Sequence, residues 1–289
     1  MASTNRLINQ FKPDSYNLKL KLNKKTKKLS GNLEIIGVRR SKPSYRITLN
    51  QCGLRIKHAK LYQIQKNNQI VKIEIIRIVH HKKLQEVRLH TKNQLLSGKY
   101  KIELEYSGEV STKGSNGFYT STWLDDELNN HEILTTQFET HYTRQLLPCI
   151  DEPEAKAIFN LKLELSEATS DTVLFNTNIQ SEELENTTRK ITFEPTPIMS
   201  TYLLALIIGD LKSKNKTVNN TEVRVFTTPN KINNTDFALD FACQSLEFLE
   251  KKFNTKYPLG KLDLVAVPDF DAGGMENWGL ITFREDLLL

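Results

Sequence analysis

The chain has 289 residues, of which 38% are hydrophobic and 26% are charged, a balance typical of a soluble globular protein with one or two domains. The net charge of +6 comes largely from lysines in the first hundred residues. The lysine-rich run at residues 24–28 contains no aromatic residue, which favours a solvated hairpin loop over a nucleic-acid surface. We therefore expect no nucleic acid as partner. No stretch approaches the roughly 18 apolar residues that span a bilayer, so we expect no membrane as partner either.

The cysteines Cys52, Cys149 and Cys243 are odd in number, lie far apart and show no CxxC spacing. Such a pattern is typical of reduced thiols in a cytosolic protein. We expect Cys149 to be a buried small apolar residue rather than a nucleophile. Residues 1–6 do not lead into a long apolar segment, so we expect no signal peptide and a cytoplasmic protein.

From Tyr16 to about Leu211, apolar residues mostly alternate with polar ones. This alternation predicts strands, and strands recurring at roughly eight to twelve residues without helices between them favour an antiparallel β-sandwich. We expect this β-domain to cover residues 1–212. The stretch from Tyr202 to Gly209 is nearly all apolar and predicts a strand that is buried on both faces.

Beyond Asp210 the composition changes, and we expect a second domain at residues 213–289. The polar stretch 213–220 predicts a connection between the domains. Residues 234–253 predict a helix, because apolar residues recur at three- and four-residue spacing and Asn234 or Thr235 can cap its start. We expect the stripe along this helix to belong to the core: Phe237, Ala238, Phe241, Ala242, Phe248 and Leu249.

The last segment has the most informative sequence. An apolar strand ends at Pro268, two glycines follow, and a new strand starts at Leu280. Gly273 and Gly274 allow backbone conformations or close approaches that a side chain forbids. A carboxylate beside them, at Glu276, suits a sheet-edge loop that offers a ligand main-chain partners and one charge. For an isolated G-G-x-E, a β-turn with a solvated glutamate is the commoner alternative.

Three stretches together resemble the zinc aminopeptidases of the aminopeptidase N and puromycin-sensitive type. Residues 268–285 contain G-G-M-E-N, similar to the G-x-M-E-N motif of that family, with Gly274 where many members have alanine. Residues 136–153 contain T-Q-F-E and P-C-I-D-E-P, and differ from the family only in the spacer 141–143. Residues 196–210 are similar to the same family.

The resemblance implies an N-terminal antiparallel β-sandwich of saddle-like shape, followed by the incomplete start of a thermolysin-like α+β catalytic domain. It implies that Glu139 and Glu276 hold the α-ammonium of a peptide and that Gln137 lies near the first side chain. The backbone of the glycine loop then lies along the substrate. The substrate-binding residues expected on this basis are Gln137, Glu139, Gly273, Gly274, Met275, Glu276 and Asn277.

An ammonium group has three donors and one charge, so two carboxylates and a carbonyl can satisfy it. Each charge-assisted contact of this kind contributes roughly 1.5–3 kcal/mol. Two carboxylates that lie close together repel each other when the cation is absent, so their loops need support. Arg144 with Asp151 is a candidate for this support, and a surface ion pair is the alternative.

The zinc-binding motif of this family, H-E-x-x-H, is missing from the sequence. None of the six histidines has a second histidine four residues away, and His131-Glu132 only begins the motif. In the family the motif follows the G-x-M-E-N strand within a few tens of residues. We therefore expect zinc in the full-length family enzyme, no zinc and no catalytic residue in this chain, and no activity of the chain alone.

Two functional hypotheses follow. The first is the N-terminal part of an aminopeptidase that removes single residues from peptide N-termini, with peptides and the missing C-terminal part of the enzyme as partners. The second is a non-enzymatic pseudo-aminopeptidase that binds peptides or proteins. A purely structural β-sandwich adaptor gives no reason for Glu139 and Glu276 to lie in intact motifs.

Overall fold

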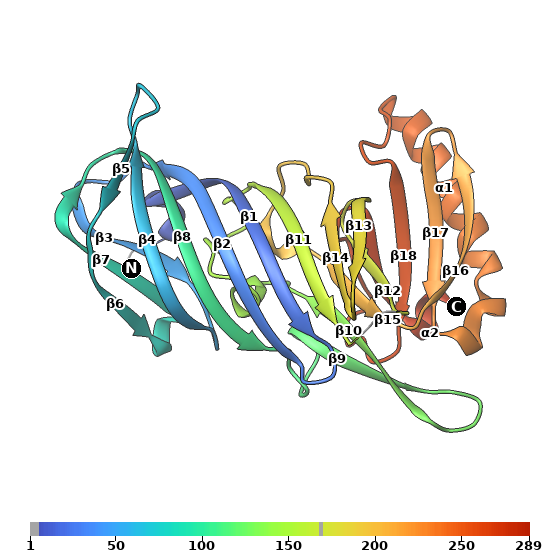
Figure 1. Cartoon of the computed structure of the whole chain (residues 1–289). Coiled ribbons are helices and arrows are strands. Elements are labelled where there is room, and N and C mark those ends of the chain that lie inside the picture. Colours follow the sequence, from blue (N-terminus) through green and yellow to red (C-terminus); the bar gives the residue numbers. More distant parts are fainter. Residues whose placement is uncertain (1–5, 168–169) are drawn as a thin grey trace.

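The computed structural model describes residues 6–167 and 170–289, and it shows a mainly β protein built in two parts (Figure 1). The mainly β architecture expected from the sequence is thereby confirmed. The first part, blue to yellow in Figure 1, contains these strands: β1 (Phe11–Asn23), β2 (Lys28–Arg39), β3 (Ser44–Asn50), β4 (Arg55–Ile64), β5 (Ile70–Ile73), β6 (Ile75–His81), β7 (Glu86–Leu95), β8 (Gly98–Glu109), β9 (Gly117–Leu124), β10 (Asn130–Gln137), β11 (Ile158–Ser166), β12 (Thr172–Phe175), β13 (Ile179–Glu185), β14 (Thr188–Phe193) and β15 (Leu206–Gly209).

The largest sheet of the first part has eight strands in the order β13-β14-β11-β1-β2-β8-β4-β5. Its pairs are antiparallel, as expected, except for β1 and β11, which run parallel. In this register Leu18 lies opposite Leu161 and Leu20 opposite Leu163. All four leucines are buried, and this match of buried faces accounts for the register.

Two smaller sheets complete the first part, with the orders β12-β15-β10-β9 and β3-β7-β6. The hydrophobic core between the sheets continues into the second part through Val265, Met275 and Leu280. Because one continuous core joins the two parts, the loops at their junction are held in a defined relation.

The lysine-rich hairpin between β1 and β2 is less solvated than expected. Lys24 pairs with Asp171 at 2.7 Å, and the side chains are only 19% and 10% exposed. Lys27 pairs with Glu132 of β10. The hairpin therefore contacts the neighbouring sheet through two of its lysines.

The strand expected from Tyr202 begins only at Leu206. Residues Thr201–Leu203 form a 3-10 turn. The Leu203 carbonyl and the Ala205 amide then bond to the side chain of Asn176 instead of to a neighbouring strand. A polar side chain therefore satisfies backbone groups that the apolar sequence pattern assigns to a sheet.

The second part, orange to red in Figure 1, consists of a five-stranded sheet in the order β16-β17-β18-β20-β19 with a helix on its outer side. The stretch 213–220, expected as a connection, forms most of an edge strand paired with its successor. Strand β16 starts at Lys212, next to the domain boundary expected between residues 212 and 213. That boundary stays a prediction. The elements are β16 (Lys212–Val218), β17 (Thr221–Thr227), α1 (Asp236–Phe253), β18 (Lys261–Val267), β19 (Gly274–Met275), β20 (Leu280–Arg284) and α2 (Glu285–Leu288).

Helix α1 is confirmed, since it starts within two residues of the expected position and ends at Phe253. Its residue Thr235 does not cap it through the side chain, because the hydroxyl donates to the Ile232 carbonyl instead. Within the described residues, 6–167 and 170–289, no helix is long and apolar enough to cross a membrane.

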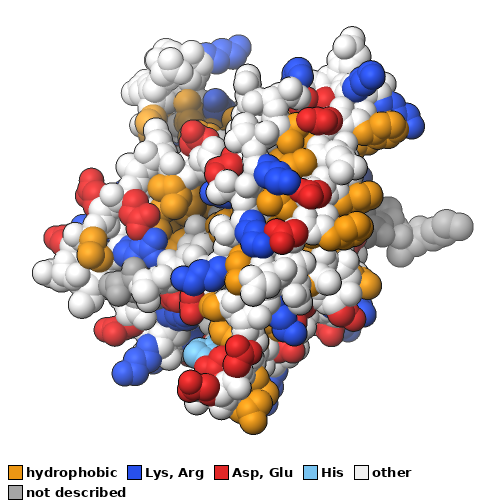
Figure 2. Space-filling view, turned by 90° about the vertical axis from the view of Figure 1, so that its right-hand side faces the viewer, with side chains coloured by type: hydrophobic (Ala, Val, Ile, Leu, Met, Phe, Trp, Pro, Cys, Tyr) orange, Lys and Arg blue, Asp and Glu red, His pale blue; other side chains and the backbone are white. Residues whose placement is uncertain are grey.

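The expectation that the whole apolar stripe of α1 belongs to the core is wrong. The face that packs on β16 and β17 consists of Ala238, Leu239, Ala242 and Leu246, where the small alanines allow close contact with the sheet. Figure 2 views the molecule from the side of α1 and shows hydrophobic side chains at the surface among charged ones. The exposed large apolar side chains of α1 are Phe237 (80% exposed), Phe241 (62%), Phe248 (60%), Leu249 (47%) and Phe253 (66%), which we term the aromatic face of α1; all except Phe253 belong to the expected stripe.

This difference between the two faces of α1 predicts different effects of substitution on stability. We expect Leu246→Ala to lower the free energy of unfolding by about 2–5 kcal/mol, since it leaves a cavity in the core. We expect Phe241→Ala to change it by less than about 0.5 kcal/mol. Urea unfolding followed by circular dichroism measures both values, and equal losses would show that the aromatic face is packed in the isolated chain.

Candidate functional site

Glu139 emerges at the end of β10, where the chain leaves the sheet. Gln137 and Phe138 are buried, and Glu139 is the first exposed residue after them. The Tyr142 amide donates to the Phe138 carbonyl at 2.9 Å and closes a turn directly after the carboxylate. Buried Phe138 thus anchors the position from which Glu139 projects.

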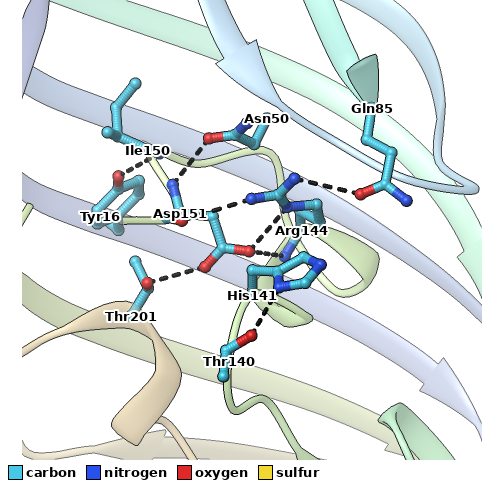
Figure 3. Close-up of polar contacts among 9 residues, drawn as sticks. All are labelled: Tyr16, Asn50, Gln85, Thr140, His141, Arg144, Ile150, Asp151 and Thr201. Carbon is cyan, nitrogen blue, oxygen red and sulfur yellow. Dashed lines mark hydrogen bonds and ion pairs between the residues drawn. The ribbon is translucent and has the colours of Figure 1, made fainter. Parts of the chain in front are cut away.

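Arg144 and Asp151 form a buried pair that supports this turn, which decides against the surface ion pair (Figure 3). The Arg144 backbone amide and Nε donate to Asp151 Oδ2 at 3.2 and 3.0 Å, and the two side chains are 13% and 0% exposed. Asp151 Oδ1 accepts from the Thr201 hydroxyl at 2.9 Å, and the Asp151 amide donates to Asn50 Oδ1 at 3.0 Å. The Asp151 carboxylate therefore joins the Glu139 loop to the 3-10 turn Thr201–Leu203, and the Asp151 amide joins it to β3.

Glu276 directly follows the edge strand β19. Its neighbours Met275 and Asn277 are buried at 1% and 2% exposure, so the alternation of strand side chains leaves Glu276 exposed. Strand β19 pairs only with β20 in the described part of the chain, and its other edge carries unpaired main-chain groups.

The glycines before Glu276 act through close packing rather than through unusual backbone angles. Neither Gly273 nor Gly274 has a positive φ, whereas Gly279 does, at 73°. A Cβ on Gly274 would lie 3.2 Å from the Phe283 ring, so an alanine there requires only a small shift. The left-handed conformation thus falls after the acidic residue, not before it.

The loop after Glu276 is held by its carbonyl groups. The Trp278 carbonyl accepts from Asn176 Nδ2 at 2.8 Å, and the Gly279 carbonyl accepts from Lys261 Nζ at 2.6 Å. Lys261 is 2% exposed and also contacts Asp263 at 2.6 Å. Burial lowers the pKa of Lys261 to about 8, against the opposing effect of Asp263.

The two glutamates act on one phenol, that of Tyr202. The pKa of Tyr202 is raised by burial first, then by the negative charge of Glu276, then by that of Glu139. The grooves on the eight-stranded sheet and between β14 and β17 are lined by neither glutamate. Both carboxylates thus lie within electrostatic range of the Tyr202 hydroxyl.

The sequence analysis missed Tyr202, because it lies in an apolar run that predicts a strand. A usable signal was present: a tyrosine hydroxyl in an otherwise apolar stretch requires a polar surrounding. Neither Glu139 nor Glu276 has a hydrogen bond or an ion pair with another residue in the ranges 6–167 and 170–289. Both carboxylates are therefore available to an external cation.

Gln137, the third residue expected to contact a ligand, is 8% exposed at the end of β10. Its Oε1 is buried and has no hydrogen-bond partner within the described residues. Because an unsatisfied buried acceptor is unfavourable by about 1–3 kcal/mol, this atom is suited to accept a bond from a ligand.

The residues present do not fit a zinc site. In the described part of the chain, no three side chains of His, Cys, Asp or Glu are grouped to hold a metal ion. We therefore assign no metal-dependent step to these residues.

The buried pair of Asp151 and Arg144 predicts a strong effect on stability. Asp151→Asn leaves the Arg144 charge without its anion and is expected to lower the free energy of unfolding by about 3 kcal/mol. The matched control is Glu185→Gln, which removes a 63% exposed partner of Lys190 and is expected to have no measurable effect. Urea unfolding of both variants measures the difference, and equal stabilities would refute the buried network.

The shared action on Tyr202 predicts a change in its titration. Negative charge disfavours the phenolate, so Glu139→Gln and Glu276→Gln are each expected to lower the pKa of Tyr202 toward its ordinary value. Fluorine NMR of the chain labelled with fluorotyrosine, with the signal assigned by Tyr202→Phe, measures this. A pKa that stays unchanged in both variants would place the glutamates away from Tyr202.

Comparison with known proteins agrees with the motifs. Residues 12–203 match the peptidase M1 N-terminal domain, and residues 237–289 match the peptidase family M1 domain. Aminopeptidase N of Lactococcus lactis subsp. lactis is 40% identical over 291 residues, which cover 100% of this chain and 32% of the relative. Aminopeptidase N of Lactobacillus helveticus is 36% identical, with 98% of this chain and 31% of the relative covered.

Endoplasmic reticulum aminopeptidase 1 of Homo sapiens is also 36% identical over 289 residues, with 98% of this chain and 30% of the relative covered. The chain thus spans about a third of the length of the curated relatives it matches. From these matches over both parts of the fold, the chain belongs to the zinc-dependent peptidase family M1 and corresponds to the N-terminal portion of its aminopeptidases.

Proposed function

We propose that this chain forms the part of a zinc-dependent aminopeptidase that binds the free N-terminus of a peptide. Glu139 and Glu276 bind the α-ammonium group, one from each part of the fold. The observation that carries this proposal is that two exposed carboxylates, lacking a cationic partner in the described residues, both act on Tyr202. A peptide ammonium supplies the missing positive charge.

The surrounding residues suit the rest of a peptide. The free edge of β19, at Gly274 and Met275, offers main-chain groups to an extended ligand. Gln137 offers a buried acceptor near the end of β10. Gly273 and Asn277 border β19, where Gly273 keeps the backbone accessible and Asn277 bonds to Thr282 and holds the loop.

When the glutamates hold the peptide N-terminus at a fixed distance from the reacting centre, only the first peptide bond lies near that centre. The whole protein then removes single amino acids from peptide N-termini, as the names of its relatives imply for them. The zinc ion belongs to residues outside those described. We propose that the chain as given binds peptides and does not hydrolyse them.

The aromatic face of α1 supports a second partner, the later part of the catalytic domain. Five large apolar side chains of one helix are exposed, and two of them, Phe237 and Phe241, stack with ring centroids 6.1 Å apart. The curated relatives are about three times as long as this chain, so their sequences contain the residues that can cover such a face.

The alternative function is a non-enzymatic pseudo-aminopeptidase that binds peptides or proteins. It uses the same two glutamates, so their geometry favours neither function. The exposed aromatic face favours the enzyme fragment, because a free-standing binding protein has no need to expose five large apolar side chains on one helix.

Peptide binding by the purified chain tests the proposal. We expect a short peptide with a free N-terminus to bind at least about tenfold more tightly than its N-acetylated form, because acetylation removes the charge that the glutamates contact. Glu139→Gln and Glu276→Gln are expected to abolish this preference, and Glu185→Gln to leave it intact. An NMR titration measures the affinities, and equal binding of both peptides by the unsubstituted chain would refute the proposal.

A further inference from the structure

Asn176 lies just after β12 and is 1% exposed. Its Nδ2 donates to the Leu203 carbonyl and to the Trp278 carbonyl, both at 2.8 Å, and its Oδ1 accepts from the Ala205 amide at 2.9 Å. Both amide protons are therefore used, one in each part of the fold. The side chain joins the segment that follows Tyr202 to the loop that follows Glu276.

The main chain at Asn176 is equally close to this loop. A Cβ on Gly279 would lie 2.1 Å from the Asn176 carbonyl oxygen, so no larger residue fits there without movement. The φ of 73° at Gly279 also favours glycine. The loop after Glu276 thus rests directly on Asn176, and its distance from β12 is fixed.

The turn Thr201–Leu203 is held from the opposite side by the Glu139 loop. The Thr201 hydroxyl donates to Asp151, and Asp151 also holds Arg144 on that loop. Tyr202 therefore lies between two attachments, one to each of the loops that carry a glutamate. Of these two, only the attachment through Asn176 crosses from the first part of the fold to the second.

We propose that Asn176 is a positioning residue that sets the distance between the carboxylates of Glu139 and Glu276. The proposal rests on the function proposed above, in which these carboxylates bind one ammonium group. A side chain with two donors and one acceptor matches the three backbone partners, of which the Leu203 carbonyl and the Ala205 amide are buried and the Trp278 carbonyl is partly buried. Aspartate lacks the donors and would set an anionic oxygen against two carbonyl groups.

The test compares Asn176→Ala with Asn230→Ala. Asn230 Nδ2 donates to the Leu124 carbonyl at 3.2 Å and so also joins the two parts, but at the far end of β9 from Gly117, which pairs with Gln137. The control thus removes one exposed amide-to-carbonyl bond between the two parts, away from the glutamates. Where Asn176→Ala does not fold, as judged by circular dichroism, Asn176→Ser replaces it, since serine keeps one donor.

Two measurements are made on each variant. The titration of Tyr202 is followed without ligand, and Asn176→Ala is expected to lower the pKa of Tyr202, while Asn230→Ala leaves it unchanged. The preference for a free over an acetylated peptide N-terminus is expected to fall about tenfold in Asn176→Ala only. In the Glu276→Gln background, Asn176→Ala is expected to have a smaller effect on Tyr202, which shows that Asn176 acts through Glu276.

The outcomes separate the two proposals. A folded Asn176→Ala variant with unchanged Tyr202 titration and unchanged amine preference overturns the role of Asn176. Equal effects of Asn176→Ala with and without the Glu276 charge also overturn it, because they reduce Asn176 to a support for Tyr202. An unsubstituted chain without amine preference, in which Asn176→Ala still shifts Tyr202 through Glu276, refutes the proposed function and supports the positioning role.

Discussion

The buried carboxylate of Asp151 is the interaction on which the arrangement of the candidate site depends. It is fully shielded from water and is bonded to Arg144 and to the Thr201 hydroxyl, while the backbone amide of Asp151 donates to Asn50 Oδ1. A buried charge is tolerated only when it is paired and its remaining lone pairs are used, and both conditions hold here. The loop that presents Glu139 therefore has one favourable position relative to the sheets.

The second carboxylate, Glu276, is held by different means. Two hydrogen bonds hold its loop: the Trp278 carbonyl accepts from Asn176, and the Gly279 carbonyl accepts from Lys261. Neither the Asn176 amide nor the Trp278 carbonyl titrates, so the bond between them does not depend on pH, whereas the Lys261 ammonium loses its charge near its lowered pKa of about 8. Together, the two sets of attachments hold the loops on either side of Tyr202 that carry the glutamates.

The two parts of the fold differ in how fully their hydrophobic cores are covered, as the two faces of α1 show. The core of the first part is continuous and reaches the strands β18 and β20. The smaller core under α1 comprises Val223, Val225, Leu246 and their neighbours, and it covers only one side of the helix. Because apolar surface in water is unfavourable, the aromatic face is the region where the fold gains most from a further partner.

The sequence by itself determined the strands, the helix and the residues that carry charge. Alternating side chains predicted β8, the glycine-containing motif located Glu276, and a second motif located Glu139, because such signals depend only on near neighbours in the chain. The tertiary structure decided the parallel pairing of β1 with β11, the exposure of the aromatic face and the place of Tyr202 beside both glutamates. Each of these depends on segments far apart in sequence, and a local pattern contains no information on which distant surface will cover it.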